Sequence, residues 1–476
     1  MAKPIDELIV QDKGLVSREI FVDEEIFKQE LSRVFARAWL FVAHEDQIAK
    51  NGDYVVSKMG TDTVIVTRDM EGEVHVLLNT CTHRGMRLCR NDMGNARTFS
   101  CPYHGWSYSM DGRIVETPGD LAGVPGHATY YHGELDKKDW GLVRAPRVKV
   151  YKRTVWASWD PDAPEFDDYL GDMKQYLDYA LDGRDGSPGN NEMIGGILKW
   201  RVPSNWKFAP ENFIGDNYHD ISHRSVDLVG INPSGGTGRR DDEPEDATTI
   251  GFPKLGHGVI GEMPYQKEPE SAGWAANPEV SEWYRKCHDA RVERFGDEHR
   301  VSMTVGTIFP NMSFHGRQPR TIAVFHPISP TEMEMWRIFL VDRDAPDAVK
   351  DMARHYHLSY SGPGGLTESD DMENWSYATD SSRGEISRSI YFNYEMGLGH
   401  ARVVPHLEGA VENGEFTEEN ARIFYRRWAE FMKAGSWDEL FPGKGPGPGG
   451  SRGAAESAPA DAEAASVDAA ATAETK

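Results

Sequence analysis

The sequence is short of cysteine and of basic residues, and each deficit excludes a class of protein. Four cysteines among 476 residues cannot supply a disulfide framework, which favours a reducing compartment. Lys and Arg together number 52 against 76 Asp and Glu, which gives a formal net charge of -24. A non-specific nucleic-acid binder needs a basic face, so this charge excludes that role.

Long apolar segments are missing as well. The chain contains no run of about 18 apolar residues, so we expect no membrane span. Its first residues, Met-Ala-Lys-Pro-Ile-Asp-Glu-Leu, lack the uninterrupted apolar core of a secretory signal peptide. We therefore expect a cytoplasmic protein.

The chain is long and rich in aromatic side chains, which are the requirements for packed domains. With 476 residues and 11% aromatics, it can form two or three packed domains. Between residues 41 and 160, short β-rich runs such as Val64-Ile-Val and Val74-His-Val-Leu-Leu are separated by turn residues such as Gly72. This texture predicts a small all-β domain of antiparallel strands.

The rest of the chain divides into three parts. Asp23 is the predicted N-cap of a helix that runs to about Trp39, inside an N-terminal helical segment, 1–40, that we expect to pack on the second domain. That domain, 161–441, mixes strands with helices and is predicted to be α+β. Its predicted helices lie at residues 278–295, 344–357 and 417–433. Residues 442–476 are rich in Gly, Pro and Ala and predict a disordered tail.

Two short loops each combine one cysteine with one histidine. They are Cys81-Thr-His83 and Cys101-Pro-Tyr-His104. Two thiolates and two imidazoles can form a tetrahedral zinc site, but zinc fingers pair Cys with Cys and His with His. One cysteine and one histidine per loop suits a two-iron cluster in which both cysteines hold one iron and both histidines the other. Cys89 and Cys287 are expected to be spare, buried thiols.

A second pair of histidines, His219 and His223, lies four residues apart. If residues 216–224 are helical, both share one face and can chelate one ion. Asp220 follows the first histidine, but it is one methylene shorter than the glutamate with which zinc proteases activate water. Two histidines and one carboxylate suit non-haem Fe(II), and Glu368-Ser-Asp-Asp371 offers the carboxylate. A cluster that carries electrons needs an acceptor, which also favours iron.

The double motif Cys81-Thr-His-Arg-Gly and Cys101-Pro-Tyr-His-Gly-Trp resembles the Rieske family. Respiratory Rieske proteins carry an extra cysteine near each loop, and none follows Cys101 at that place, so the chain is similar to the oxygenase branch. The stretch Glu211-Asn-Phe-Ile-Gly-Asp-Asn-Tyr-His and the segments Gly362-Pro-Gly-Gly and Glu368-Ser-Asp-Asp resemble the large (α) subunits of aromatic-ring-hydroxylating oxygenases.

This resemblance implies an α+β fold with two parts: an N-terminal all-β Rieske [2Fe-2S] domain at 41–160, and an α+β catalytic domain at 161–441 whose antiparallel sheet is flanked by helices. It assigns one [2Fe-2S] cluster to Cys81, His83, Cys101 and His104, and one mononuclear Fe(II) to His219, His223 and Asp371. Asp370 is the less favoured neighbour of Asp371. Many relatives have one more residue between the two histidines, which leaves the geometry at His223 to be established.

The resemblance also implies roles around the iron. Asp216 is expected to bridge His104 of a neighbouring subunit and His219, which makes it the catalytic link for electrons. The residues expected to line the substrate pocket are Asn212, Phe213, Asn217, Leu366 and Thr367. Arg224 beside His223 is expected to point to solvent, although it can also meet a substrate carboxylate.

The implied function is that of a terminal oxygenase α subunit. It dihydroxylates an aromatic ring with O2 and yields a cis-dihydrodiol, in the catabolism of a polycyclic aromatic hydrocarbon or a phthalate-like aromatic acid. The implied partners are a small β subunit in an α3β3 assembly, a ferredoxin and an NAD(P)H-dependent reductase. A Rieske monooxygenase or O-demethylase is the closest alternative, and a zinc hydrolase or a pure electron-transfer Rieske protein is more remote.

Overall fold

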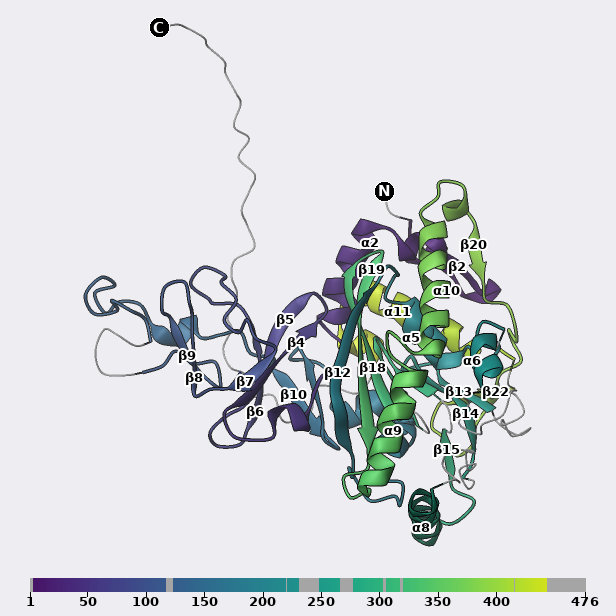
Figure 1. Ribbon diagram of the computed structural model, residues 1–476. Coiled ribbons are helices and arrows are strands. Elements are labelled where there is room, and N and C mark those ends of the chain that lie inside the picture. The colour runs from purple at the N-terminus through teal and green to yellow at the C-terminus, as the bar shows by residue number, and fades with distance from the viewer. Residues whose placement is uncertain are drawn as a thin grey trace, which may run out of the picture.

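The computed structural model describes residues 3–116, 123–219, 221–230, 248–265, 277–302, 305–316, 320–414 and 416–442. A strand-rich part projects from a larger part that contains a long sheet and most of the helices (Figure 1). Beyond Pro442 the predicted tail lies outside the described residues, as does Asp220. Within the described part of the chain, no helix is both long enough and apolar enough to cross a membrane.

The projecting part is built from three antiparallel sheets. Their strands are β3 (Leu40–His44), β10 (Arg147–Tyr151) and β11 (Thr154–Ser158) in the first, β4 (Asp53–Met59), β5 (Asp62–Arg68), β6 (Val74–Leu78) and β7 (Met93–Asn95) in the second, and β8 (Thr98–Ser100) and β9 (Ser107–Ser109) in the third. The β-branched runs at Val64 and Val74 form adjacent strands, which confirms their prediction.

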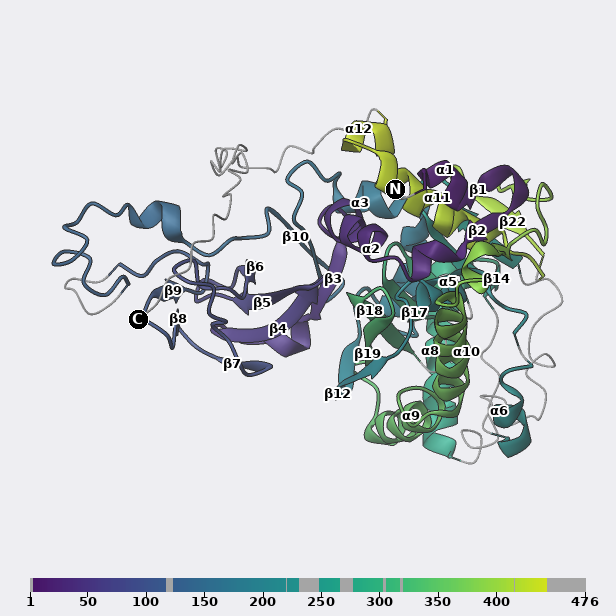
Figure 2. The ribbon, with the colours of Figure 1, turned by 90° about the horizontal axis from the view of Figure 1, so that it is seen from above.

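The larger part contains a ten-stranded sheet in the described residues, and every strand pair in it is antiparallel. Its strands are β12 (Glu192–Val202), β13 (Thr248–Phe252), β14 (His257–Pro264), β15 (Arg300–Ser302), β16 (Val305–Ile308), β17 (Met312–His315), β18 (Thr321–Ser329), β19 (Glu332–Val341), β21 (Arg402–Val403) and β22 (Val411–Asn413). Helix α9 packs on β12 and β19 at one end of this sheet, and α10 packs on α9 (Figures 1 and 2).

The helices of this part are α3 (Phe166–Leu170), α4 (Lys174–Leu181), α5 (Phe208–Gly215), α6 (Arg224–Val229), α8 (Pro278–Phe295), α9 (Asp347–Tyr360), α10 (Leu366–Ser382), α11 (Glu419–Lys433) and α12 (Trp437–Leu440). The predicted helix at 278–295 coincides with α8, and α9 and α11 lie within three residues of their predicted bounds. Helix α5 packs against α11 and against strands of the long sheet, which buries Phe213 and Ile214.

The N-terminal segment joins distant parts of the chain. It contains α1 (Ile5–Leu8), β1 (Ile9–Val10), β2 (Leu15–Ser17) and α2 (Glu24–Glu30), and β2 pairs with β20 (Tyr391–Asn393). Asp23 accepts hydrogen bonds from two backbone amides at the start of α2, which confirms the predicted cap. The helix does not continue to Trp39, because a π-helical turn replaces it from Leu31 to Phe35 and the chain then enters β3. There Arg33 donates to the carbonyl of Met432, at the end of α11.

A buried ion pair fixes the start of α5. The Lys207 ammonium lies 2.5 Å from Glu30, and both side chains are fully buried. The indole nitrogens of Trp206 and Trp428 donate to the same carboxylate, at 2.9 and 2.8 Å. Glu30, the last residue of α2, therefore binds the N-cap residue of α5 and a tryptophan of α11.

We predict that Lys207→Met lowers the free energy of unfolding by about 3–5 kcal/mol, because it leaves the Glu30 charge buried without a cation. Denaturant unfolding measures this loss. The double variant Glu30→Gln with Lys207→Met should recover most of it, since no charge is then buried. Equal losses in the single and double variants would contradict this account.

Candidate metal centres

The two Cys/His loops have closely similar backbones. The amide of Cys81 donates to the carbonyl of Met86, and the amide of Gly85 donates back to the carbonyl of Cys81. In the second loop Cys101, Gly105 and Trp106 make the corresponding two bonds. Both glycines have positive φ, 71° and 76°, which a side chain would strain. The two loops therefore present a cysteine and a histidine each in similar turns, as one shared cluster requires.

The side chains of these loops converge. The rings of His83 and His104 lie 4.7 Å apart, and the thiols of Cys81 and Cys101 are close enough to interact. Both thiols are buried, whereas His104 is exposed. Burial lowers the pKa of His83, and the neighbouring His104 lowers it further.

The His83 ring shows whether a two-iron cluster fits between these loops, because one of its nitrogens lacks a hydrogen-bond partner among the described residues. The Nδ1 atom of His83 is buried and has no hydrogen-bond partner among the described residues, although a buried ring nitrogen normally has one. Its ring stacks on Trp106 at 4.9 Å, with 4° between the planes, so its orientation is fixed. On the cysteine side of the site, the hydroxyl of Tyr108 lies 3.2 Å from the Cys81 sulfur. Two thiols and two oriented imidazoles fit a Rieske cluster.

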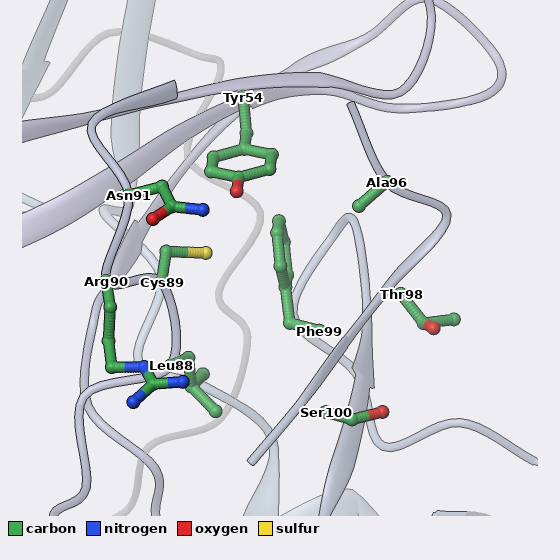
Figure 3. Close-up of a pocket in the computed structure, with 9 residues that line it drawn as sticks. All are labelled: Tyr54, Leu88, Cys89, Arg90, Asn91, Ala96, Thr98, Phe99 and Ser100. Atoms are coloured by element: carbon green, nitrogen blue, oxygen red, sulfur yellow. The ribbon is translucent and has the colours of Figure 1, made fainter. Parts of the chain in front are cut away.

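Cys89 lies apart from this set. It lines a cavity of about 480 Å³ together with Tyr54, Leu88, Arg90, Asn91, Ala96, Thr98, Phe99 and Ser100. Its thiol is directed toward the ring of Phe99, on the side of the Tyr54 hydroxyl (Figure 3). Burial raises the pKa of the Cys89 thiol to about 12, so the thiol is protonated and unreactive at neutral pH. Cys89 and Cys287 are both buried and free, as predicted.

His219, His223 and Asp371 form a second converging set. The two Nε2 atoms are 2.9 Å apart, and Oδ1 of Asp371 lies 3.3 Å from Nε2 of His219 and 3.2 Å from Nε2 of His223. Two ligands bound at about 2.1 Å and about 90° apart are separated by about 3.0 Å. The buried Oδ1 of Asp371 has no hydrogen-bond donor in the part of the chain that the structure describes. The three atoms therefore fit one facial set of ligands on a single ion.

The local structure of this segment differs from its prediction. A helical face shared by His219 and His223 was conditional on a helix over residues 216–224, but α5 ends at Gly215 and α6 begins only at Arg224. That condition is not met, because Asp216 ends the helix with φ −95° and ψ 76°, outside the helical region. His219 and His223 converge from an irregular turn instead of one helical face, which is how a four-residue spacing still brings both rings to one point.

Asp216 orients His219. The Nδ1 atom of His219 donates to the backbone carbonyl of Asp216 at 2.6 Å, and the Asp216 carboxylate lies 3.3 Å away. This bond places the proton on Nδ1 and leaves Nε2 free to bind a metal. Burial alone would lower the pKa of His219, but the carboxylates of Asp216 and Asp371 together raise it to about 10. Burial favours a neutral Asp371, yet both histidines hold its pKa well below the usual range.

The neighbouring acids Asp370 and Asp371 lie on different sides of the His223 ring. Asp371 points at both histidine Nε2 atoms, whereas Asp370 lies 3.4 Å from Nδ1 of His223 and accepts a hydrogen bond from Ser225 at 2.7 Å. A carboxylate on the far nitrogen of a ligating imidazole orients the ring. The geometry therefore favours Asp371 as the ligand and Asp370 as its support.

The predicted pocket residues separate into two groups. Phe213 is buried against His315, Phe325 and Trp375. Two of the remaining ones make hydrogen bonds: Asn212 accepts from the indole of Trp375 at 3.4 Å, and Thr367 donates its hydroxyl to the carbonyl of Tyr360. The other two are placed by the chain alone, since Asn217 follows Asp216 and Leu366 is the first residue of α10. The Thr367 hydroxyl is therefore engaged with the backbone and is not free for a substrate. Arg224 is exposed, as predicted.

An ion pair that sequence analysis missed holds the carboxylate side of the centre. Arg337 on β19 donates two bonds of 2.5 Å and one of 3.1 Å to Glu368, and each side chain is 1% exposed. Glu368 also accepts from the amide of Gly362, and it lies three residues before Asp371 on α10. The pair therefore fixes the first turn of the helix that carries Asp371. The one signal in the sequence was this three-residue spacing, which places Glu368 one helical turn before Asp371.

We predict that Arg337→Met lowers the affinity for the mononuclear iron by about tenfold to a hundredfold, because the support of a ligand is lost. Equilibrium dialysis of the iron measures the effect. Arg320→Met is the matched control, since Arg320 and Asp342 form an equally buried ion pair at 1% and 2% exposure. Equal iron loss in both variants would mean that general destabilisation, and not the position of Asp371, is responsible.

Two metal centres on one chain, one of Rieske type and one with a facial triad, define a Rieske-type oxygenase. Residues 38–127 match the Rieske [2Fe-2S] domain, and residues 166–434 match the catalytic domain of the ring-hydroxylating alpha subunit. The chain is 38% identical over 444 residues to the biphenyl 2,3-dioxygenase subunit alpha of Rhodococcus jostii (strain RHA1), covering 92% of this chain and 93% of that one. It is 37% identical over 452 residues to the benzene 1,2-dioxygenase subunit alpha of Pseudomonas putida, covering 92% and 95%.

A solved structure of naphthalene 1,2-dioxygenase with indole bound in the active site has a TM-score of 0.81 and 30% identity, covering 92% of this chain and 97% of that one. The chain belongs to the α subunits of ring-hydroxylating dioxygenases. It is a Rieske non-haem iron dioxygenase whose cofactors are one [2Fe-2S] cluster and one mononuclear iron. The predicted fold class is confirmed, and the zinc-hydrolase and electron-transfer alternatives are excluded.

Proposed function

We propose that this α subunit dihydroxylates the ring of an apolar aromatic hydrocarbon to a cis-dihydrodiol. The observation that carries the proposal is the convergence of His219, His223 and Asp371 in a chain of this family. Three protein ligands on one face leave other positions of an iron open for dioxygen chemistry. The Rieske cluster, held by Cys81, His83, Cys101 and His104 in this proposal, supplies electrons one at a time.

The chain's own residues would position the parts of this reaction. Asp370 and the backbone of Asp216 hold the imidazoles of His223 and His219 in the tautomer that binds metal. Glu368 and Arg337 hold the helix that carries Asp371.

Electrons would pass between subunits, through Asp216. Strands β8 and β9, which flank the loop of His104, lie far from α6 and α10 in both views of the chain (Figures 1 and 2). His104 is exposed, and the Asp216 side chain, whose Oδ1 lies toward His219, is still 28% exposed. A Rieske histidine of a neighbouring copy would bond to the exposed side of this carboxylate and complete the link from His104 through Asp216 to His219.

Three features support a hydrocarbon over an aromatic acid as substrate. Arg337, whose guanidinium lies 5.2 Å from the centre of the Phe213 ring, already has its charge neutralised by Glu368. Arg224 is exposed to solvent. The relatives named above act on biphenyl, benzene and naphthalene by their names. We further propose a small β subunit, a ferredoxin and a reductase as partners.

The test is turnover with matched substrate pairs, such as naphthalene against 2-naphthoate and biphenyl against biphenyl-4-carboxylate. The α subunit is co-expressed with its β subunit and supplied with ferredoxin and reductase. We expect diol from the hydrocarbons, and less than about a tenth as much from each acid, because a carboxylate left without a cation is costly to bury. Preference for the acids would refute the substrate class.

A further inference from the structure

Trp140, at the end of the short helix η5 (Lys137–Trp140), lies at the surface beside the two Cys/His loops. It is 40% exposed, and its ring meets the buried ring of Trp106 edge-on, with 5.9 Å between the ring centres. Trp106 in turn stacks on His83 at 4.9 Å. Both separations lie in the range in which aromatic rings pack directly on each other. Ring contacts therefore run from the solvent to one of the four residues assigned to the cluster.

The backbone of Trp140 is fixed to the first of these loops. The hydroxyl of Thr82, which lies between Cys81 and His83, donates to the carbonyl of Trp140 at 2.7 Å. The amide of Leu142 donates to the carbonyl of Gly112 at 2.8 Å, which holds the next residues against the turn after β9. The exposed indole is thus positioned before any partner arrives, which lowers the entropy cost of binding one.

The other histidine assigned to the cluster, His104, is committed to a different contact. In the proposed function it meets Asp216 of a neighbouring copy. An electron donor that used the same point would have to displace that copy at each delivery, so the donor needs a second approach. The chain that leads into β10, and with it η5, lies at the end of the projecting part that is remote from the larger part (Figures 1 and 2). Trp140 offers that second approach.

The distribution of charge along the chain favours an acidic carrier at the projecting part. Residues 41–160 contain 15 Lys and Arg and 15 Asp and Glu, so the net charge of -24 arises entirely outside them. An acidic protein is repelled by the rest of the chain and much less by this part. Long-range electrostatics of this kind steer a charged partner toward one region of a surface.

Two exposed cations, Lys138 and Arg144, lie within four residues of the exposed indole. Val143 adds an apolar side chain that is 52% exposed. Of the two acids in the same segment, Asp136 caps η5 by accepting from the amide of Lys138 at 3.0 Å, which leaves Asp139 as the exposed acid. An aromatic anchor with a charged rim is typical of a docking surface.

We propose that an electron-carrier protein docks on the surface around Trp140, and that the rings of Trp140 and Trp106 lead its electron to the His83 side of the cluster. This inference rests on the proposed ferredoxin partner. The carrier loses one electron and the cluster gains it, and no bond forms or breaks at these residues. The carrier that fits is a small protein with an acidic face and a one-electron centre near that face.

The first test measures binding and needs no turnover. The probe is an oxidised [2Fe-2S] ferredoxin that, when reduced, passes electrons to the wild-type protein, and calorimetric titration gives its Kd. Trp140→Leu should raise the Kd by about thirtyfold, as loss of a central aromatic anchor does in other interfaces. Trp140→Phe should raise it less, because a ring remains. An unchanged Kd in Trp140→Leu would overturn the proposal.

The second test follows the reduction of the cluster in a stopped-flow instrument, without substrate or O2. With the reduced ferredoxin at a concentration below its Kd, Trp140→Leu should be reduced at least about tenfold more slowly than the wild type. With dithionite, a small reductant that needs no docking surface, the two rates should be equal. Equal slowing by both reductants would mean that the substitution disturbs the cluster itself, and would overturn the proposal. So would a variant that loses its subunit assembly but is still reduced by ferredoxin at the normal rate, since a neighbouring copy would then cover Trp140.

The third test reverses charges. Lys138→Glu with Arg144→Glu should lower the association rate of the ferredoxin by about tenfold at low salt and weaken its salt dependence. Arg285→Glu with Lys286→Glu is the matched control, since both are exposed cations on α8 in the larger part and the change in net charge is the same. Equal losses in the two double variants would mean that only net charge matters, and would overturn the site. If all variants behave as expected but the wild type forms no diol, the proposed function fails and the docking site stands.

Discussion

Replacing Asp216 by asparagine should slow product formation by about a hundredfold while both metal centres stay loaded. The amide keeps the size of the side chain but loses the negative charge beside His219. Asp216 lies 3.3 Å from Nδ1 of His219, and its buried oxygen lacks a partner within the described residues. Stopped-flow absorbance should show that the reduced cluster persists in the presence of substrate and O2, whereas the wild-type cluster is oxidised.

The path between subunits can be tested by complementation. Chains with Cys101→Ser lack the cluster, and chains with His223→Ala lack the mononuclear iron, so each alone should be inactive. Co-expression in one assembly brings an intact cluster next to an intact iron centre in some subunit pairs. Partial recovery of activity is expected, and complete inactivity of the mixed assembly would contradict transfer between copies.

Replacing Asp371 by alanine should remove the mononuclear iron and lower product formation by about a thousandfold or more, since a metal contributes several kcal/mol to such chemistry. Iron analysis should fall from about three to about two atoms per chain, the two of the cluster. The Rieske absorbance and EPR signal should be unchanged.

Asp370→Asn is the matched control for this variant. Its side chain lies beside Nδ1 of His223 and not at the converging Nε2 atoms. It should retain the iron with an affinity reduced by about tenfold. Loss of iron from Asp370→Asn together with retention by Asp371→Ala would reverse the assignment of the two acids.

Local patterns predicted much of the fold. Val64-Ile-Val and Val74-His-Val-Leu-Leu became neighbouring strands, and Asp23 caps α2 as its type and position predict. Helix α8 has Asn277 as a capping residue and Pro278 at its first position, and these two residues mark its start in the sequence. In each case the residues that predict the element lie in it or within a few residues of it in the sequence.

Other features depend on contacts that are remote in sequence. Helix α10 was not among the predicted helices, because Leu366–Ser382 is rich in acids, serine and threonine and has no side-chain cap. It is held by Arg337 on β19 and by packing on α9. The four-residue spacing of His219 and His223 fits a helix, but it does not show that the chain leaves the helix at Asp216. Glu211 meets Tyr394 and Tyr425 only in the folded chain.

The ligand set was predicted from motifs, and the geometry of His219, His223 and Asp371 supports it. The domain limits at 41–160 and 161–441 stay predictions. The family matches at 38–127 and 166–434 lie close to them.

The most direct test of the proposed dioxygenation is a single turnover under ¹⁸O₂. The α subunit, co-expressed with its β subunit, is reduced chemically, mixed with naphthalene or biphenyl, and its product analysed by mass spectrometry and NMR. We expect two labelled oxygens on adjacent ring carbons in cis configuration. A product with a single labelled oxygen, or no product from protein with both centres filled, would contradict ring dihydroxylation.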